Sequence, residues 1–226
     1  VHVSHLSEAS GLDFVRGSDQ DISCEVTAHH LFLSDLDQAR LGPFGIMNPP
    51  LRSRHDVDTL WSCLRHINMI ASDHAPHSIA DKNMPYPPPG VPGVQTLLPL
   101  LLSRLDEISL ERLVNLVSAA PAIRFNLKNK GAIREGYDAD LILVDPNDRK
   151  IITPSMLQSK CGWTPFEGCV AVFPSLTMVR GEVVFSEGSI KVKKGWGTQV
   201  CGAGFRQLSS PLLPQWSSQR PPKSVV

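Results

Sequence analysis

The sequence has no excess of charge and no long apolar run. Its 22 Lys+Arg balance its 22 Asp+Glu, and a chain without a basic excess lacks the electrostatic signature of nucleic-acid-binding proteins. The most apolar stretch, Val94–Leu102, is interrupted by Gln95, Thr96 and Pro99. It falls far short of the roughly 20 apolar residues of a transmembrane helix. We therefore expect no nucleic-acid partner and no membrane insertion.

Paired cysteines are also missing. The five cysteines are scattered and none forms a C-x-x-C pair, which predicts neither a disulfide framework nor a zinc knuckle. A reducing, cytoplasmic compartment is the matching expectation. The chain begins with Val1 rather than Met, and its first residues alternate like a strand. We therefore expect it to be truncated at the N-terminus.

The first part of the chain alternates apolar segments with segments of helical periodicity. Strands are predicted at Val1–Leu6, Ile22–Thr27 and Ile67–Ala71, and helices at Glu8–Arg16 and Asp56–His66. Ser7 is the expected N-cap of the first helix. A strand–helix–strand rhythm of this kind builds parallel sheets, so the predicted fold class is α/β.

The amino-acid composition changes along the second part of the chain. Pro85–Gly93 holds five prolines and two glycines and is predicted to be a loop. Two helices follow, at Gln95–Leu105 and from Leu110 into Arg124. Residues 131–204 are rich in strand formers and predict a small antiparallel β unit, part of a β-sandwich. Residues 205–226 are dense in Ser, Pro and Gln, which predicts a disordered tail or linker.

Polar residues stand at the ends of the predicted strands. His5 closes the first strand, Glu25 lies in the second, and Asp73 follows the third. In parallel α/β folds the carboxyl ends of strands form the open mouth, and imidazole and carboxylate groups are ligands for divalent metals. The alternatives are a hydrogen-bonded core histidine for His5 and a turn-capping carboxylate for Asp73.

Two further features could line a site. His29 and His30 are adjacent, so their side chains cannot both face one ion, and a structural role is the favoured interpretation. The proline-flanked Asn48 lies in a rigid polar loop, Met47–Arg52. It could present an amide to a substrate, or the loop could be an ordinary connection.

Four segments carry a resemblance to a known family. They read VHVSHL (Val1–Leu6), CEVTAHHL (Cys24–Leu31), MNPPLRS (Met47–Ser53) and ASDHAPH (Ala71–His77). Their order and spacing resemble those of dihydroorotases of the amidohydrolase superfamily. PPPGVPG (Pro87–Gly93), WTPFEG (Trp163–Gly168) and Gly195-Trp196-Gly197 are most similar to the dihydroorotase domain of the animal multifunctional pyrimidine-synthesis polypeptide. The implied fold for residues 1–130 is the last three strands of a (β/α)8 TIM barrel.

The resemblance implies metal ligands. His5 resembles the histidine that binds the second metal of a two-metal zinc centre, and Asp73 resembles the aspartate that binds the first metal and shuttles the catalytic proton. Glu25 matches a glutamate of an extra zinc site, but Ser4 stands where that site uses a cysteine. The family's other ligands match no residue here. We therefore expect the complete protein to supply them, and this chain alone to be inactive.

The resemblance also implies a substrate and partners. Asn48 falls where family members contact the substrate, His77 resembles the histidine that holds its carboxylate, and Pro89-Gly90 resembles the loop backbone that bonds its ring. The implied reaction is the reversible closure of N-carbamoyl-L-aspartate to L-dihydroorotate in pyrimidine biosynthesis. For the complete protein the resemblance implies a homodimer, and fusion to other pyrimidine-pathway domains is the accompanying expectation. The alternatives are a hydantoinase- or allantoinase-like enzyme and a non-catalytic scaffold with the same fold.

Overall fold

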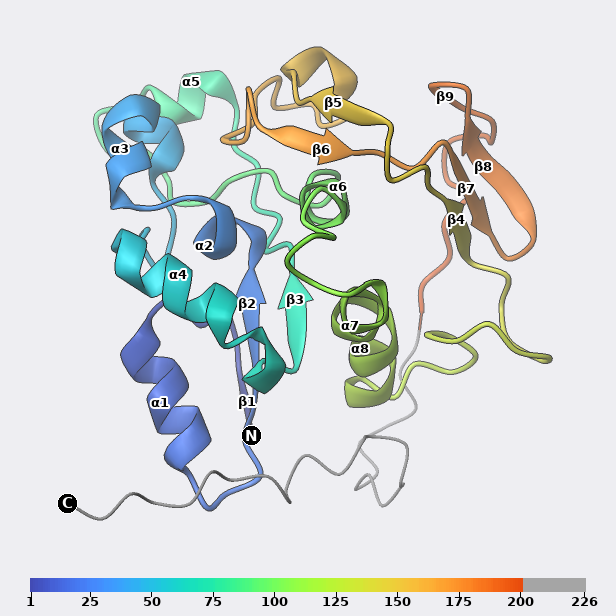
Figure 1. The fold of residues 1–226 in the computed structure, drawn as a ribbon. Helices are drawn as coiled ribbons and strands as arrows, with labels where there is room; N and C mark the ends of the chain where they lie inside the picture. The colour runs from blue at the N-terminus through green and yellow to red at the C-terminus, as the bar shows by residue number, and fades with distance from the viewer. Residues whose placement is uncertain (201–226) are drawn as a thin grey trace.

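A three-stranded parallel sheet organises the first part of the chain. The computed structural model describes residues 1–200 (Figure 1). Strands β1 (His2–Val3), β2 (Ser23–Thr27) and β3 (Met69–Ala71) pair in the order β1-β2-β3. Both pairs are parallel, and parallel neighbours need a crossover connection. The α/β prediction is therefore confirmed.

Helices supply those crossovers and bury the sheet. α1 (Ala9–Gly17) links β1 to β2. The longer link from β2 to β3 holds α2 (Ala28–Phe32), α3 (Asp35–Leu41), the 3-10 turn Gly42–Gly45, α4 (Arg54–Ser62) and the 3-10 turn Leu64–His66. Figure 1 shows α1 and α4 together along one flank of the sheet. Leu12 of α1 and Leu60 of α4 are buried in one core cluster with Cys24 and Val26 of β2.

After β3 the chain forms short helices before the β-rich part. These are α5 (Ile79–Lys82), α6 (Leu97–Leu102), α7 (Leu110–Val114) and α8 (Ala120–Arg124), with a π-helical turn, Asn115–Ala119, between the last two. The predicted loop over 85–93 is confirmed, since no helix or strand falls within it. So is the continuation of the second predicted helix into Arg124 through Pro121, which sits in the first turn of α8, where proline is tolerated.

Three local expectations differ from the structure. Helix α1 begins at Ala9 with Glu8 at the N-cap position, and the Ser7 hydroxyl instead accepts a hydrogen bond from Arg52 Nε at 3.1 Å. Helix α3 was not predicted because it buries no residue and so has no apolar period. The helix expected over Gln95–Leu105 is shorter, because α6 spans Leu97–Leu102.

Antiparallel strands build the second part. β4 (Leu141–Leu143), β7 (Leu176–Val179), β8 (Glu182–Ser186) and β9 (Ser189–Ile190) form one sheet in the order β4-β7-β8-β9. β5 (Arg149–Ile151) pairs with β6 (Val170–Val172), and a 3-10 turn, Pro154–Met156, lies between them. The hairpin turns at Arg180-Gly181 and Glu187-Gly188 have positive φ, as two-residue hairpins of right-handed twist require. The division at residue 131 stays a prediction, and the predicted tail lies outside the described residues.

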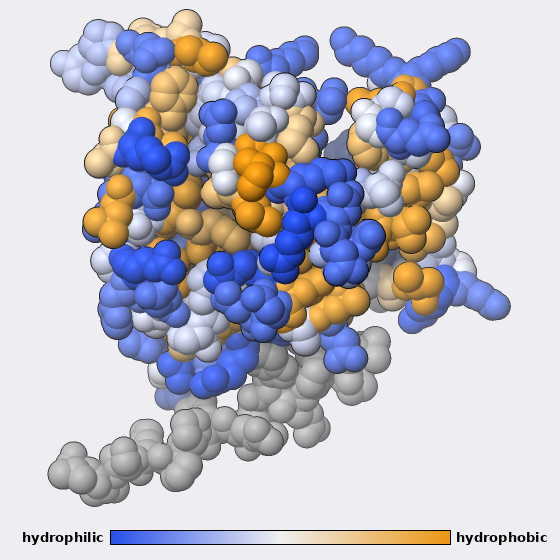
Figure 2. All heavy atoms as spheres, turned by 45° about the horizontal axis from the view of Figure 1, so that its top comes forward, coloured by the Kyte–Doolittle hydropathy of each residue, from blue (hydrophilic) through white to orange (hydrophobic). Residues whose placement is uncertain are grey.

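The two parts share a second buried cluster. Leu100 of α6 and Ala171 of β6 belong to it, and so do Met47, Val91 and Phe166 from connecting loops. Figure 1 shows β5 and β6 above α6. Figure 2 shows the face beyond the strand ends, where hydrophilic side chains separate small hydrophobic groups. Among residues 1–200, no helix has the length and apolarity to cross a bilayer.

A close backbone approach at Gly93 supports the loop after β3. A Cβ added there would lie 2.6 Å from the Ser72 carbonyl oxygen, which cannot move without shifting the end of β3. We expect Gly93→Ala to lower the free energy of unfolding by about 1–3 kcal/mol through overpacking. Gly17→Ala is the control, because nothing lies within 4 Å of its Cβ position, and it should be neutral or stabilising by up to about 1 kcal/mol. Urea unfolding of both variants checks this, and equal effects would contradict it.

Candidate functional site

Polar side chains from three neighbouring strand ends meet at one edge of the sheet. His5 follows β1, His29 follows β2 and Asp73 follows β3. His5 has φ 40° and Asp73 has φ 43°. This left-handed conformation is uncommon for residues other than glycine and concentrates at functional sites. The parallel order β1-β2-β3 places all three ends on the same side.

His29 connects these groups. Its side chain is 1% exposed, and its Nε2 has no hydrogen-bond partner while lying 3.9 Å from Asp73 Oδ2. Burial lowers the pKa of His29 to about 3, with smaller contributions from the nearby His30 and His5. The ring is therefore neutral at neutral pH. His5 and Asp73 thus flank one buried, unpaired imidazole, which the sequence analysis had favoured as structural.

His30 has different surroundings. Its Nδ1 lies 2.8 Å from Thr27 Oγ1 and its Nε2 lies 3.1 Å from the Pro49 carbonyl oxygen. Because a carbonyl only accepts, Nε2 carries the hydrogen and Nδ1 accepts from the Thr27 hydroxyl. His30 therefore fastens the loop that contains Asn48 to the end of β2.

Glu25 lies apart from the strand ends. It sits in the middle of β2, half-buried, and its Oε2 is 3.2 Å from Nε2 of His2, at the start of β1. Within residues 1–200, no three His, Cys, Asp or Glu side chains are grouped closely enough to hold a metal ion. The metal roles of Glu25, His5 and Asp73 stay predictions.

The residues expected to contact the substrate are joined by hydrogen bonds and by the chain. We call the set Ile46–Asn48, His77 and Pro89-Gly90 the substrate wall. His77 Nε2 lies 3.0 Å from the Pro89 carbonyl oxygen, and Gly90 N donates to the Ile46 carbonyl oxygen at 2.9 Å. Gly90 has φ 129°, and a Cβ there would lie 2.7 Å from the Ala75 carbonyl oxygen, so glycine is required. Asn48, two residues after Ile46, is exposed. His77, Pro89 and Gly90 are therefore linked directly, and Asn48 through the chain.

Two residues that contact the substrate wall were missed by the sequence analysis. The Lys82 side chain is 0% exposed, although lysine is among the least buried residue types. Trp163 Nε1 donates to the His77 carbonyl oxygen at 2.8 Å across 86 positions of sequence. The WTPFEG segment was singled out only by resemblance, and the position of Lys82 in a short polar helix resembles that of any surface lysine.

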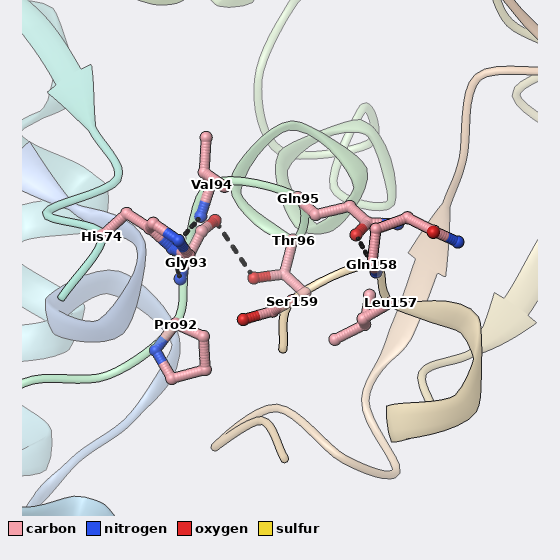
Figure 3. A pocket seen from close by; sticks show the side chains of 9 residues that line it. All are labelled: His74, Pro92, Gly93, Val94, Gln95, Thr96, Leu157, Gln158 and Ser159. Carbon is pink, nitrogen blue, oxygen red and sulfur yellow. Dashed lines mark hydrogen bonds between the residues drawn. The ribbon is translucent and has the colours of Figure 1, made fainter. Parts of the chain in front are cut away.

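A small pocket lies beside this wall. It has a volume of about 230 Å³ and is lined by His74, residues 92–96 and residues 157–159 (Figure 3). His74 Nδ1 accepts from the backbone N of Gly93 at 3.0 Å and of Val94 at 3.2 Å. Neither Asp73 nor His77 lines it. His74 therefore orders the loop after β3 and is not part of the group around His29.

The protein is of the α/β class with a parallel sheet. In such folds the functional residues lie at the carboxyl ends of the strands, which is where His5, His29 and Asp73 lie. The chain belongs to the amidohydrolase family, whose profile matches residues 2–184. Proteins of this family generally bind metal ions.

Individual relatives agree with this family. The chain is 44% identical over 221 residues to a dihydroorotase of Methanosarcina mazei, covering 90% of this chain and 48% of that protein. It is 36% identical over 208 residues to the multifunctional protein CAD of Squalus acanthias, covering 88% of this chain and 9% of that protein. The solved L-hydantoinase (dihydropyrimidinase) of Arthrobacter aurescens superimposes with a TM-score of 0.82 at 32% identity, over 88% of this chain and 48% of that one. The chain thus spans about half the length of the dihydroorotases it matches.

The buried His30 predicts a pH-dependent stability. Burial lowers its pKa to about 4, from an ordinary value of 6.5. As the pH falls below 6.5 the unfolded state takes up a proton that the folded state refuses until about pH 4, so the free energy of unfolding decreases over that window. Relative to His30→Gln, the wild-type chain should lose up to about 1.4 kcal/mol per pH unit.

Urea unfolding at several pH values tests this expectation. His30→Gln is the reference that lacks this ionisable ring, so the difference between the two pH series isolates the contribution of His30. A constant difference between wild type and His30→Gln from pH 7 to pH 4 would contradict it.

Proposed function

We propose that the chain is the C-terminal half of a dihydroorotase, which interconverts N-carbamoyl-L-aspartate and L-dihydroorotate. The observation that carries this proposal is the meeting of His5 and Asp73 around the buried His29 at one sheet edge. The 44% identity to a dihydroorotase supports the substrate. In this proposal β1, β2 and β3 are the last three strands of a (β/α)8 barrel, and the antiparallel strands are part of its attached β-sandwich.

The residues at the strand ends fit a divalent metal centre. Imidazole and carboxylate are common ligands of zinc. An unpartnered, neutral Nε2 buried beside a carboxylate is the kind of group that a ligand-binding site leaves open. We assign His5 and Asp73 as ligands of a two-zinc centre, and Glu25 to an additional zinc site. The other ligands come from the rest of the protein.

When bound, the metal ions polarise the substrate amide and lower the pKa of a coordinated water. Asp73 then acts on the proton. Its side chain is 38% exposed, so substrate can reach it, and it accepts the proton from the attacking water. It returns the proton to the leaving ring nitrogen, so one carboxylate serves as general base and then general acid.

We assign His77 to the binding of the substrate carboxylate. Its Nε2 is bonded to the Pro89 carbonyl oxygen, so a hydrogen bond to an anion would have to come from Nδ1–H, which the ring carries together with Nε2–H only in its protonated form. A charge-assisted hydrogen bond of this kind is about twice as strong as a neutral one. Asn48, which is exposed, is assigned as a second substrate contact.

The Pro89-Gly90 backbone recognises donors on the substrate ring. Pro89 has no N–H, and the Gly90 N–H is used by Ile46. Carbonyl oxygens have two lone pairs, so the Pro89 and Gly90 carbonyls can still accept from the ring N–H groups. The complete protein is proposed to be a cytoplasmic homodimer acting on this small molecule. Fusion to other pyrimidine-pathway domains is proposed by analogy with the multifunctional CAD relative.

A hydantoinase-like activity is the second candidate, favoured by the superposition on an L-hydantoinase. Both reactions open a cyclic amide, and they differ in the substrate carboxylate that His77 would bind. A panel of dihydroorotate, hydantoin, dihydrouracil and allantoin on the complete protein distinguishes them. Turnover of hydantoin but not of dihydroorotate would replace the first proposal by the second.

The role of Asp73 is tested by Asp73→Asn in the complete protein. Loss of the proton carrier and of one metal ligand should lower kcat/KM for dihydroorotate by at least about a hundredfold. Asp13→Asn, on the exposed face of α1, is the matched control and should have no effect. Full activity of Asp73→Asn would contradict the assignment.

The division of the site between two halves makes a separate prediction. The 226-residue chain assayed with added zinc should not hydrolyse dihydroorotate, because it contributes only part of the ligand set. Clear turnover that is removed by a chelator would show that the described residues suffice.

A further inference from the structure

We propose that Lys82 is a positioning residue for substrate binding, because its buried ammonium fastens the Ile46 and Pro88–Gly90 backbones into one wall beside His77. The inference rests on the proposed function and adds a residue to which no substrate role was assigned. Lys82 itself does not touch the substrate, since its side chain is 0% exposed.

Three carbonyl groups surround the ammonium. Lys82 Nζ donates to Ile46 O at 3.1 Å, to Pro88 O at 3.0 Å and to Gly90 O at 3.1 Å. These bonds use all three donors of the group. The acceptors come from two loops, one 36 and one 6 to 8 positions away. The Lys82 side chain therefore joins the two loops, in addition to the backbone hydrogen bond from Gly90 N to the Ile46 carbonyl oxygen.

Within the described part of the chain, no carboxylate pairs with the Lys82 ammonium. None of the ion pairs found in residues 1–200 includes Lys82. A buried charge is costly unless its hydrogen bonds are satisfied, and an apolar side chain of similar shape, such as Met, would fill the volume without that cost. The stabilisation that Lys82 provides therefore comes from its hydrogen bonds to the carbonyl groups, and these bonds hold the two loops.

The fastened loops carry the residues of the proposed substrate wall. The Ile46 carbonyl, which also accepts from Gly90 N, lies two positions before Asn48. The Pro88 and Gly90 carbonyls flank Pro89, whose own carbonyl contacts His77 Nε2. If the ammonium were removed, the 88–90 segment would lose two of its bonds, and the Pro89 oxygen would no longer hold the His77 ring in one orientation.

Trp163 contacts both Lys82 and the backbone of His77. Its ring centroid lies 5.6 Å from Lys82 Nζ, within the range of a cation–π interaction. Its Nε1–H donates to the His77 carbonyl oxygen. Its ring packs edge-on against that of Phe44, with 4.9 Å between the ring centroids. Lys82 and the backbone of His77 therefore share one support. The Ser78–Asp81 capping box starts α5 and places Lys82 at the end of that helix.

The test uses the complete protein and compares Lys82→Met with Lys160→Met. Met keeps the length of the side chain and removes the three donors, whereas Lys160 is exposed and serves as the matched control. Steady-state hydrolysis of dihydroorotate should show a KM raised at least about tenfold and a kcat changed less than about threefold, as for loss of binding that is equal in the ground and transition states. Bound metal should be unchanged. Amide hydrogen exchange at Gly90 should be faster than in Lys160→Met.

Other outcomes would overturn the inference. An unchanged KM in Lys82→Met, or a fall in kcat with loss of metal at constant KM, would show that Lys82 acts on the fold or the metal centre alone. Unchanged exchange at Gly90 would show that the ammonium does not hold the loop.

A second variant serves if Lys82→Met does not fold. Trp163→Phe keeps an aromatic face and removes the bond to the His77 carbonyl, so KM should rise about threefold with kcat retained, as for a weaker loss of uniform binding. An unchanged KM would again refute the shared support. If the wild-type protein does not hydrolyse dihydroorotate, the proposed function fails, while the exchange comparison still decides whether Lys82 fastens the loop.

Discussion

The parallel pairing of β1, β2 and β3 is the constraint on which the site depends. Parallel neighbours run in the same direction, so the residues that follow each strand are delivered to one edge. His5, His29 and Asp73 follow three different strands, yet they come within electrostatic range of one another. His5 and Asp73 have left-handed backbone conformations. These conformations turn the chain shortly after β1 and β3 end, at the proposed metal site.

The second level of organisation is a set of buried polar groups that fasten loops. Loops carry the substrate contacts in this type of fold, and here they have little secondary structure to hold them. His30 joins the end of β2 to the loop at Pro49, Lys82 joins that loop to the segment around Pro89, and Trp163 adds the backbone of His77. Each group is buried and directional, so the loops are fixed in position by hydrogen bonds as well as by apolar packing.

The two adjacent histidines after β2, His29 and His30, differ in their hydrogen bonding. His30 has both ring nitrogens bonded, whereas the Nε2 of His29 is buried without a partner beside Asp73. An unsatisfied buried nitrogen costs free energy, so this one marks the centre of the site more clearly than any exposed residue does. Both rings are neutral, because burial lowers the pKa of each, and a neutral imidazole does not repel a nearby cation.

The sequence by itself determined the local structure and the strand-end residues. Apolar periodicity reports burial, so it located the three parallel strands and the helices that cover them, and it placed His5 and Asp73 at strand ends. It was silent on α3, which buries nothing, and on α5, which is four residues long. Only the tertiary structure decided that His29 rather than His30 faces Asp73, that Glu25 pairs with His2, and that Lys82 is buried. The reason is sequence separation: these contacts join residues between 6 and 44 positions apart, and no local pattern of residue types records which carbonyl or carboxylate a side chain will meet.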